Sequence, residues 1–363
     1  MSIGIIGTTT QTLKITNKIQ KVNKVHAYDV SHTVNMFNAE NYACVADLMV
    51  NMDRPRTVFT SSPKSVPQIL EWSDPEDTVI NCTLDHFDRS LFYENQCSEK
   101  SVHYLSASLT NDAFLVGGKK RVFNTHEPLF YAFAKNVQHA GDIPGSGHFA
   151  KMVLDALECV MFQSIGDAFA YANGNIPVML SLMDKALHMD ITGPVIERSK
   201  SQLYVTRNYL DVAQTKNTTA WFMEYAFKTR TPTPVVHAAI NARTSSQYAK
   251  FSETRQTYNT FYDPNVILQT VRFCYAMAYY ECRQLSNGKV TAWVQNSNAA
   301  CPMFEIHDPM VIMDTTVEYV RSFVMHCVHC GIPVPTVQAA LSQYDFMKQE
   351  RTSMNFIASL RNV

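Results

Sequence analysis

A long apolar helix predicted near the middle of the chain restricts the fold more than any other feature. Gly145 and Gly147 precede it, and Lys151 and Glu158 lie in its first half. Its apolar residues recur at spacings of three and four, as one helix face requires: Phe149, Met152, Val153, Ala156, Leu157, Val160 and Met161. Lys151 and Glu158 point the same way two turns apart, so they suit either proton chemistry or a surface ion pair.

The residues before this helix alternate between strand and helix patterns. Helical stretches at 63–72 and 86–95 separate strand candidates at 2–7, 24–29, 56–61, 78–83, 101–106 and 113–118. Such alternation predicts an α/β fold with a largely parallel sheet. After residue 146 helical patterns dominate, at 147–172, 178–187, 193–209, 218–229, 234–253, 264–284, 309–330 and 335–343. We therefore expect two domains, residues 1–142 and residues 143–363, of which the second is all-helical.

The wording of the central helix resembles the signature helix of the 6-phosphogluconate dehydrogenases, approximately G-x-G-H-F-x-K-M-V-H-N-x-x-E-Y. The matching positions are Gly145, Gly147, His148, Phe149, Lys151, Met152, Val153 and Glu158. Segment 331–345, the Glu350-Arg351 pair and Arg361 resemble the same family. The resemblance implies a Rossmann-like α/β N-terminal domain at 1–142. It also implies an all-α C-terminal domain at 143–363 for substrate binding and dimerisation.

The dinucleotide site implied by the resemblance departs from its pattern, G-x-G-x-x-G/A, whose glycines admit the pyrophosphate and let helix and strand pack closely. Gly7 holds the first position, whereas Thr9 and Thr12 stand at the second and third. Val30 replaces the family's 2′-phosphate-binding arginine, and Leu84 replaces its asparagine beside the nicotinamide. The chain has only 12 glycines, where average usage of about 7% predicts roughly 25. We therefore expect no cofactor and a degenerate site on a retained scaffold.

On the central helix, the resemblance assigns Lys151 as the general base and Glu158 as the general acid. The family's histidine and asparagine at the next positions are here Leu154 and Asp155. A carboxylate four residues after Lys151 favours the ammonium form and raises the pKa of the lysine, which opposes its use as a base. Cys159 replaces a tyrosine that contacts the substrate phosphate in the family. We interpret Lys151 and Glu158 as vestigial catalytic residues.

Residues 215–221, TKNTTAW, resemble the family's phosphate loop Q-K-G-T-G-K-W through Lys216 and Thr218. Arg243 and Arg361 fall on the family's two phosphate-binding arginines, the second of which reaches across from the partner subunit. These four groups could form a phosphate clamp, or they could be retained as structural ion pairs. The family's further tail, with its trans-acting histidine, has no counterpart after Arg361.

Charge and cysteine content limit the partners and the compartment. The 31 basic and 32 acidic residues give a net charge of −1, so bulk charge favours neither nucleic acid nor an anionic membrane as partner. The 9 cysteines are scattered and odd in number, which suits a reducing compartment. We see no signal peptide and no long apolar run, so we expect a cytoplasmic or intracellular protein. The HCVHC run at 326–330 lacks a second ligand cluster, so we expect packing there and no metal site.

Three functions remain open at this point. The first is a pseudoenzyme repurposed as a structural, self-assembling protein, for example in a virus, and built as a homodimer or a higher assembly through its helical domain. Near-zero net charge with 20 phenylalanines, 17 tyrosines and 17 methionines suits association. The second is a binding module for a phospho-sugar acid, using the surviving clamp. The third is an active decarboxylating 6-phosphogluconate dehydrogenase that uses NADP, or NAD through Asp29 at the end of the second strand.

Overall fold

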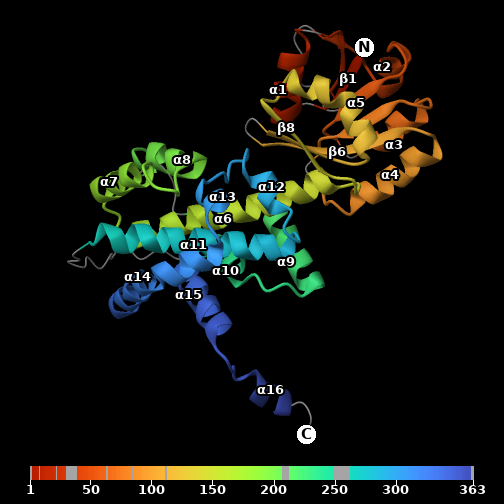
Figure 1. Cartoon of the computed structure of the whole chain (residues 1–363). Coiled ribbons are helices and arrows are strands. Elements are labelled where there is room, and N and C mark those ends of the chain that lie inside the picture. The colour runs from red at the N-terminus through yellow and green to blue at the C-terminus, as the bar shows by residue number, and fades with distance from the viewer. Residues whose placement is uncertain are drawn as a thin grey trace. The chain divides into compact units, whose positions relative to one another are not determined.

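The first part of the chain forms an eight-stranded sheet in the order β3-β2-β1-β4-β5-β6-β7-β8 (Figure 1). The strands are β1 (Ile3–Ile6), β2 (Val25–Tyr28), β3 (Glu40–Asn41), β4 (Thr57–Thr60), β5 (Thr78–Asn81), β6 (His103–Thr110), β7 (Ala113–Gly117) and β8 (Asn136–Gly141). Neighbours pair in parallel except β6 and β7, which are antiparallel. This computed structural model describes residues 2–7, 9–21, 23–29, 39–62, 64–83, 85–110, 113–206, 212–248 and 262–360.

Helices cover both faces of this sheet, which explains why its central strands β1, β4 and β5 are buried along their whole length. They are α1 (Thr10–Ile19), α2 (Val45–Val50), α3 (Ser65–Glu71), α4 (Arg89–Glu99) and α5 (Lys120–Tyr131). Successive strand residues point to opposite faces. Ile5 accordingly belongs to the apolar cluster that contains residues of α1 and α5. Ile6 belongs to the second cluster, with residues of α2, α3 and α4.

The rest of the chain is helical. Its helices are α6 (Ser146–Tyr171), α7 (Ile176–Ala186), α8 (Pro194–Leu203), α9 (Asn217–Thr229), α10 (Pro234–Ser246), α11 (Pro264–Leu285), α12 (Val290–Val294), α13 (Met303–Ile306), α14 (Pro309–Cys330), α15 (Pro335–Lys348) and α16 (Met354–Leu360). The chain divides into two compact units, Met1–Met152 and Val153–Val363, called here the sheet unit and the helical unit. The division between these units lies inside α6, between Met152 and Val153, whereas the sequence predicts a domain boundary between residues 142 and 143.

Buried carboxylates join helices within the helical unit. Glu281 on α11 accepts hydrogen bonds from the backbone N–H groups of Val235 and Val236, at 2.9 and 3.0 Å, at the start of α10. Asp167 on α6 likewise accepts from Thr336 and Val337 at the start of α15, at 3.0 and 3.2 Å. The oxygens of each carboxyl group satisfy N–H groups that have no partner inside their own helix. These hydrogen bonds fix where α10 and α15 begin relative to α11 and α6.

The predicted fold class is confirmed: a largely parallel α/β sheet is followed by an all-helical part. The two edge strands, β3 and β8, were not predicted. Among the described residues, no helix combines the length and apolarity needed to cross a membrane. All 9 cysteines are unpaired thiols.

Candidate functional site

The β1–α1 turn, from Gly7 to Thr12, stands where a dinucleotide pyrophosphate would lie in a Rossmann sheet. Gly7 has a φ of +89°, and a Cβ added there would lie 2.5 Å from the Ser61 hydroxyl, so this glycine is required by the turn. Thr9 is the N-cap of α1 and forms a capping box with Thr12. The Thr9 N–H donates to the Thr12 hydroxyl at 2.9 Å, and the Thr12 N–H donates to the Thr9 hydroxyl at 3.3 Å.

The hydroxyl of Thr12 also donates to the Gly7 carbonyl at 2.8 Å, and its side chain is fully buried. The backbone N–H groups of Thr9 and Thr12 therefore already donate to threonine hydroxyls. In phosphate-binding turns, N–H groups at the start of a helix donate to the ligand instead. Val30 and Leu84, the other two predicted departures around this site, lie outside the described residues.

The glycines before α6 are explained by backbone contact. A Cβ on Gly147 would lie 2.5 Å from the Ser106 carbonyl oxygen of β6, so no larger residue fits there. The Ser106 hydroxyl accepts from the backbone N–H groups of Gly145 and Gly147, at 3.1 and 3.3 Å. The signature glycines therefore dock the start of α6 onto the sheet.

His148 locks the same junction through a closed hydrogen-bond ring. Its Nε2–H donates to the Asn81 carbonyl at 3.1 Å, and its Nδ1 accepts from the Ser90 hydroxyl at 3.2 Å. Ser90 accepts from the Tyr104 hydroxyl at 3.2 Å, and Tyr104 accepts from the Asn81 side-chain amide at 2.9 Å. Burial lowers the pKa of His148 to about 4, although hydrogen bonding to Asn81 raises it. The histidine is therefore neutral, as this direction of donors requires.

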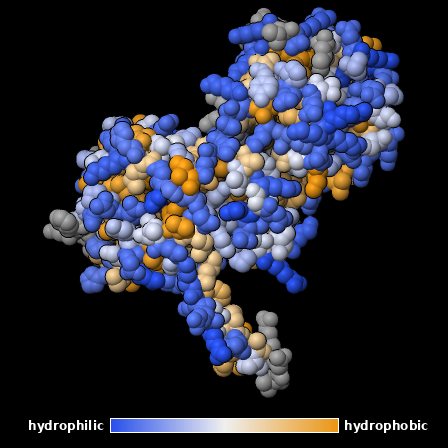
Figure 2. Space-filling model, viewed as in Figure 1, coloured by the Kyte–Doolittle hydropathy of each residue, from blue (hydrophilic) through white to orange (hydrophobic). Residues whose placement is uncertain are grey.

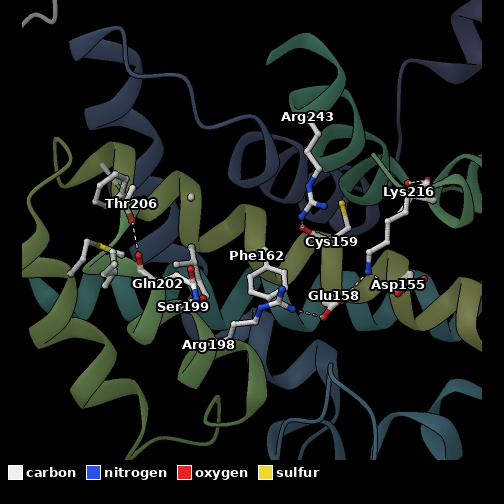
Figure 3. A pocket seen from close by; sticks show the side chains of 16 residues that line it. Asp155, Glu158, Cys159, Phe162, Arg198, Ser199, Gln202, Thr206, Lys216 and Arg243 are labelled. Carbon is white, nitrogen blue, oxygen red and sulfur yellow. Dashed lines mark hydrogen bonds and ion pairs between the residues drawn. The ribbon is translucent and has the colours of Figure 1, made fainter. Parts of the chain in front are cut away.

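A pocket of about 460 Å³ follows one face of α6 in the helical unit (Figure 3). The α6 residues that line it are Asp155, Glu158, Cys159, Phe162, Ile165, Gly166 and Phe169. The other walls come from Met179 on α7, from Arg198, Ser199, Gln202, Leu203 and Thr206 on or just after α8, from Lys216 and Thr219 at the start of α9, and from Arg243 on α10. We call this cavity the α6 pocket.

An ion-pair cluster occupies one end of the α6 pocket. The Lys216 ammonium lies 3.1 Å from Asp155 Oδ1 and 3.1 Å from Glu158 Oε2. Both carboxylates are buried, and the Thr218 hydroxyl donates to the second oxygen of Asp155 at 2.9 Å. Partial burial lowers the pKa of Lys216, but the Asp155 and Glu158 carboxylates outweigh it, so the net shift is upward. Lys216 therefore remains an ammonium that is held by two acids.

Two arginines reach the same end of the pocket. The Arg243 guanidinium donates to the Cys159 carbonyl at 3.3 Å, and Arg198 lies 4.0 Å from Glu158 Oε1. Arg198 also stacks over the Phe162 ring, 5.5 Å from its centroid. Because Glu158 and Cys159 are adjacent on α6, both guanidinium groups lie near one turn of that helix (Figure 3).

The structure brings together part of the predicted site. Glu158, Lys216 and Arg243 line one pocket, whereas Thr218 turns to Asp155 and is not a lining residue. Lys151 lies on α6 in the sheet unit and is not part of the α6 pocket. Arg361 lies outside the described residues, so the four-membered phosphate clamp stays a prediction.

Sequence reasoning missed the pocket residues on α7 and α8, notably Met179, Arg198 and Gln202. The apolar spacing of Phe162, Ile165 and Phe169 was visible, but it is the spacing of any core helix face. In the HCVHC run, Cys330 contacts His326 at 3.7 Å and Cys327 is buried. Among the described residues there is no group of three or more His, Cys, Asp or Glu side chains able to hold a metal ion.

Comparison with known proteins points to one enzyme family. A putative 6-phosphogluconate dehydrogenase of Bacillus subtilis is 28% identical over 189 residues, which cover 47% of this chain and 63% of that protein. The chain therefore spans less than two thirds of that relative's length. The decarboxylating 6-phosphogluconate dehydrogenase of Lactococcus lactis is 20% identical over 86% of this chain and 82% of its own. No protein-family model matches.

Among solved structures, the 6-phosphogluconate dehydrogenase of Plasmodium falciparum superposes with a TM-score of 0.83, at 18% identity. The match covers 99% of this chain and 96% of that one. At this identity the superposition establishes the fold. A 3-hydroxyisobutyrate dehydrogenase of Salmonella typhimurium matches less closely, with a TM-score of 0.56 over 68% of the chain.

Proposed function

The chain is a divergent relative of the 6-phosphogluconate dehydrogenases, and we propose that it keeps the α6 pocket for binding and does not oxidise 6-phosphogluconate. In this proposal the sheet unit is a scaffold and the helical unit carries the activity. Because the identity to these enzymes is only 28% and 20%, the similarity alone does not assign their activity to this chain.

The observation that carries the proposal is the ion-pair cluster of Lys216, Asp155 and Glu158. The resemblance assigns Lys216 to the substrate phosphate and Glu158 to acid catalysis, yet here these two side chains hold each other. Asp155, which replaces a neutral family asparagine, adds a second buried acid. Lys216 is held by both carboxylates at 3.1 Å, so a phosphate dianion brought to its ammonium group meets two acids at close range.

The β1–α1 turn supports the same proposal. A pyrophosphate needs free backbone N–H groups and close approach to the turn, which the second and third glycines normally permit. Thr9 and Thr12 place β-branched side chains at those two positions and use the Thr9 and Thr12 N–H groups in their capping box. The described residues of this turn do not fit a dinucleotide, so we derive no hydride-transfer step.

A second candidate role, self-association, rests on the C-terminal helix. Every residue of α16 is exposed, including the large apolar side chains of Met354, Phe356, Ile357 and Leu360. Figure 2 shows hydrophobic and hydrophilic residues together on the C-terminal part of the surface. Exposed apolar side chains that gather on one short segment are typical of a contact surface. We propose that α16 contributes to a homodimer, and removal of residues 352–363 should then shift the sedimentation of the full chain towards the monomer.

The direct test of lost oxidation is an assay of 6-phosphogluconate with NADP and with NAD, followed by the absorbance of reduced nicotinamide. We expect no rate above the protein-free blank. Appearance of reduced nicotinamide that disappears in Lys151→Ala would contradict the proposal, because Lys151 is the residue that the resemblance assigns as base.

A further inference from the structure

We propose that the α6 pocket binds a small amphiphilic monoanion, a carboxylate carried on an aromatic or branched aliphatic body. The inference deepens the proposed function and rests on it, since it names the ligand class of a pocket used for binding. Its volume of about 460 Å³ lies in the range of small-molecule sites.

The shape of the pocket suits an elongated ligand with two unlike ends. Its α6 wall extends from Asp155 to Phe169, which is about 21 Å along a helix axis at 1.5 Å per residue. The charged side chains stand at the Asp155 end, where Lys216, Arg198 and Arg243 meet α6. A ligand that fills the pocket therefore has a charged group at one end only.

The far end of the pocket is lined mainly by apolar side chains, with the polar Ser199, Gln202 and Thr206 among them (Figure 3). Phe162, Ile165 and Phe169 of α6 face Met179 of α7 and Leu203 of α8 across it. A sugar acid placed there would meet only three polar side chains among the described residues, those of Ser199, Gln202 and Thr206, so several of its hydroxyl groups would be unmatched, and each unmatched hydroxyl costs about 1–3 kcal/mol. An aromatic or branched aliphatic body instead gains free energy in proportion to the apolar area that it buries.

The charges at the near end select a monoanion. Three cations, Lys216, Arg198 and Arg243, face the two carboxylates of Asp155 and Glu158, which leaves one net positive charge. Lys216 is already held at 3.1 Å by both acids, so the arginines supply the attraction. Among the described residues the Arg243 guanidinium donates one hydrogen bond, to the Cys159 carbonyl, and it carries further N–H donors. A guanidinium fork matches the two oxygens of a carboxylate.

Gly166 provides a place to close the pocket without disturbing the helix. It is an exposed lining residue, and a Cβ built on it would meet only the Gln163 side-chain nitrogen, at 3.6 Å. A phenylalanine at this position therefore has room at the wall of the α6 pocket, where its ring can reduce the volume open to a ligand. Ser199, on the α8 wall, offers a second site for the same change.

The test uses the full chain and two fluorescent probes. Anilinonaphthalene sulfonate is an amphiphilic monoanion, and phenylnaphthylamine is its uncharged analogue. We expect saturable binding of the sulfonate, with affinity about tenfold above that of the uncharged probe. Gly166→Phe and Ser199→Phe should each weaken sulfonate binding by about tenfold or more. Ser201→Phe, on the same helix α8 but outside the pocket, should bind as the unaltered chain does.

Arg243→Met should bring the affinities for the two probes to within about twofold of each other, because it removes the main donor for the anion. Circular dichroism melting of each variant shows that it is folded before its affinity is compared. Unchanged sulfonate binding in both filled variants would overturn the proposal, and so would equal binding of the two probes by the unaltered chain. A rise in affinity of about tenfold on removal of residues 352–363 would also overturn it, since a chain segment would then be the occupant.

Failure of this inference is distinguishable from failure of the proposed function. Oxidation of 6-phosphogluconate that depends on Lys151 contradicts the proposed function, whatever the probes do. Absence of oxidation together with probe binding that ignores Gly166→Phe leaves the proposed function intact and removes only the ligand class.

Discussion

The β1–α1 turn and the α6 pocket both differ from the pattern of the 6-phosphogluconate dehydrogenases, and the differing side chains find their partners at different range in the two places. In the turn, Thr9 and Thr12 bond to each other and the Thr12 hydroxyl donates to the Gly7 carbonyl, so both threonines are satisfied within the turn, which in our proposal is closed to a dinucleotide. In the pocket, Asp155 bonds to Lys216 and Thr218 at the start of α9, and a cavity of about 460 Å³ remains beside it. The threonine hydroxyls find their partners within the turn itself and fill it. Asp155 finds its partners on another helix, and a cavity remains beside it.

Both units contain buried ionisable groups whose pKa values burial shifts. The sheet unit buries His148 and His126, whose pKa values burial lowers. The helical unit buries Asp167 and Glu281, whose pKa values burial raises, to about 6 and about 8. A buried neutral histidine makes the unfolding free energy fall as pH falls, whereas a buried protonated acid makes it fall as pH rises. These groups therefore give the two units opposite pH dependence.

The largest effect that we expect is on the pH dependence of the unfolding free energy, which should have opposite signs in the two units. Burial raises the pKa of Glu281 from 4.5 to about 8, and the Val235 and Val236 amides oppose the shift. Because the unfolded state releases this proton first, the unfolding free energy of the helical unit falls as pH rises through that window. Burial lowers the pKa of His148 from 6.5 to about 4, so the sheet unit loses stability as pH falls through that range.

Urea unfolding across pH measures the helical-unit half of this expectation. In a Trp72→Phe background, the remaining tryptophans are Trp221 and Trp293, both in the helical unit. Glu281→Gln should remove most of the fall in stability, on the order of 3 kcal/mol. The exposed Glu224→Gln is the matched control and should keep the original slope. An unaltered slope in Glu281→Gln would mean that Glu281 does not titrate in this window.

The next largest effect is expected at the ion-pair cluster in the α6 pocket. Lys216→Met leaves the buried carboxylates of Asp155 and Glu158 facing each other without their shared cation. We expect a loss of about 2 kcal/mol, below the cost for a fully buried pair because the Lys216 side chain is 50% exposed. Thermal unfolding at neutral pH measures it, with the exposed Lys185→Met as control. A loss no larger than the control's would show that the cluster is not structural.

A smaller effect is expected at the closed site. Thr12→Val keeps the shape of the side chain but removes the hydroxyl that bonds to Gly7 O and accepts from the Thr9 N–H. The cost should be about 1 kcal/mol, typical of a lost helix cap. Thr125→Val removes an exposed hydroxyl from α5 in the same unit and should cost less. Equal melting temperatures for the two variants would contradict the view that Thr12 closes the turn.

The smallest effect is a gain. Gly166→Ala replaces a glycine inside α6 where a Cβ meets nothing closer than 3.6 Å, so unfolding should become harder by about 0.5–1 kcal/mol. Gly288→Ala is the matched contrast, because that glycine has open space around it but a φ of +81°. It should destabilise by about 1 kcal/mol. Destabilisation by Gly166→Ala would show that α6 needs a glycine there, which the geometry does not indicate.

Strong periodicity made much of the fold predictable. The central helix was expected at 147–172 and spans Ser146–Tyr171, and the helix expected at 309–330 spans Pro309–Cys330. β8, Asn136–Gly141, was not predicted because its residues are mostly half-buried and do not alternate. Capping by distant side chains, as by Glu281 on α10, leaves no local signal in the sequence.

The candidate site was predictable only for residues that lie in recognisable sequence motifs. Glu158, Lys216 and Arg243 were found by resemblance, and the structure places them in one pocket. Arg198 and Met179 were not found, because their contact with α6 depends on how α7 and α8 pack, which is a long-range property. The pairing of Lys216 with Asp155 is of the same kind, since 61 residues separate them.

The central claim is that the turn is closed to a dinucleotide while the α6 pocket is open to a ligand. Calorimetric titration of one preparation with NADP, and then with anilinonaphthalene sulfonate, tests both halves together. The account predicts no heat of binding with NADP at millimolar concentration, and saturable heat with the sulfonate that Gly166→Phe removes. Saturable NADP binding that is lost in Thr9→Trp would contradict the first half, and sulfonate binding that Gly166→Phe leaves unchanged would contradict the second; either result overturns the claim.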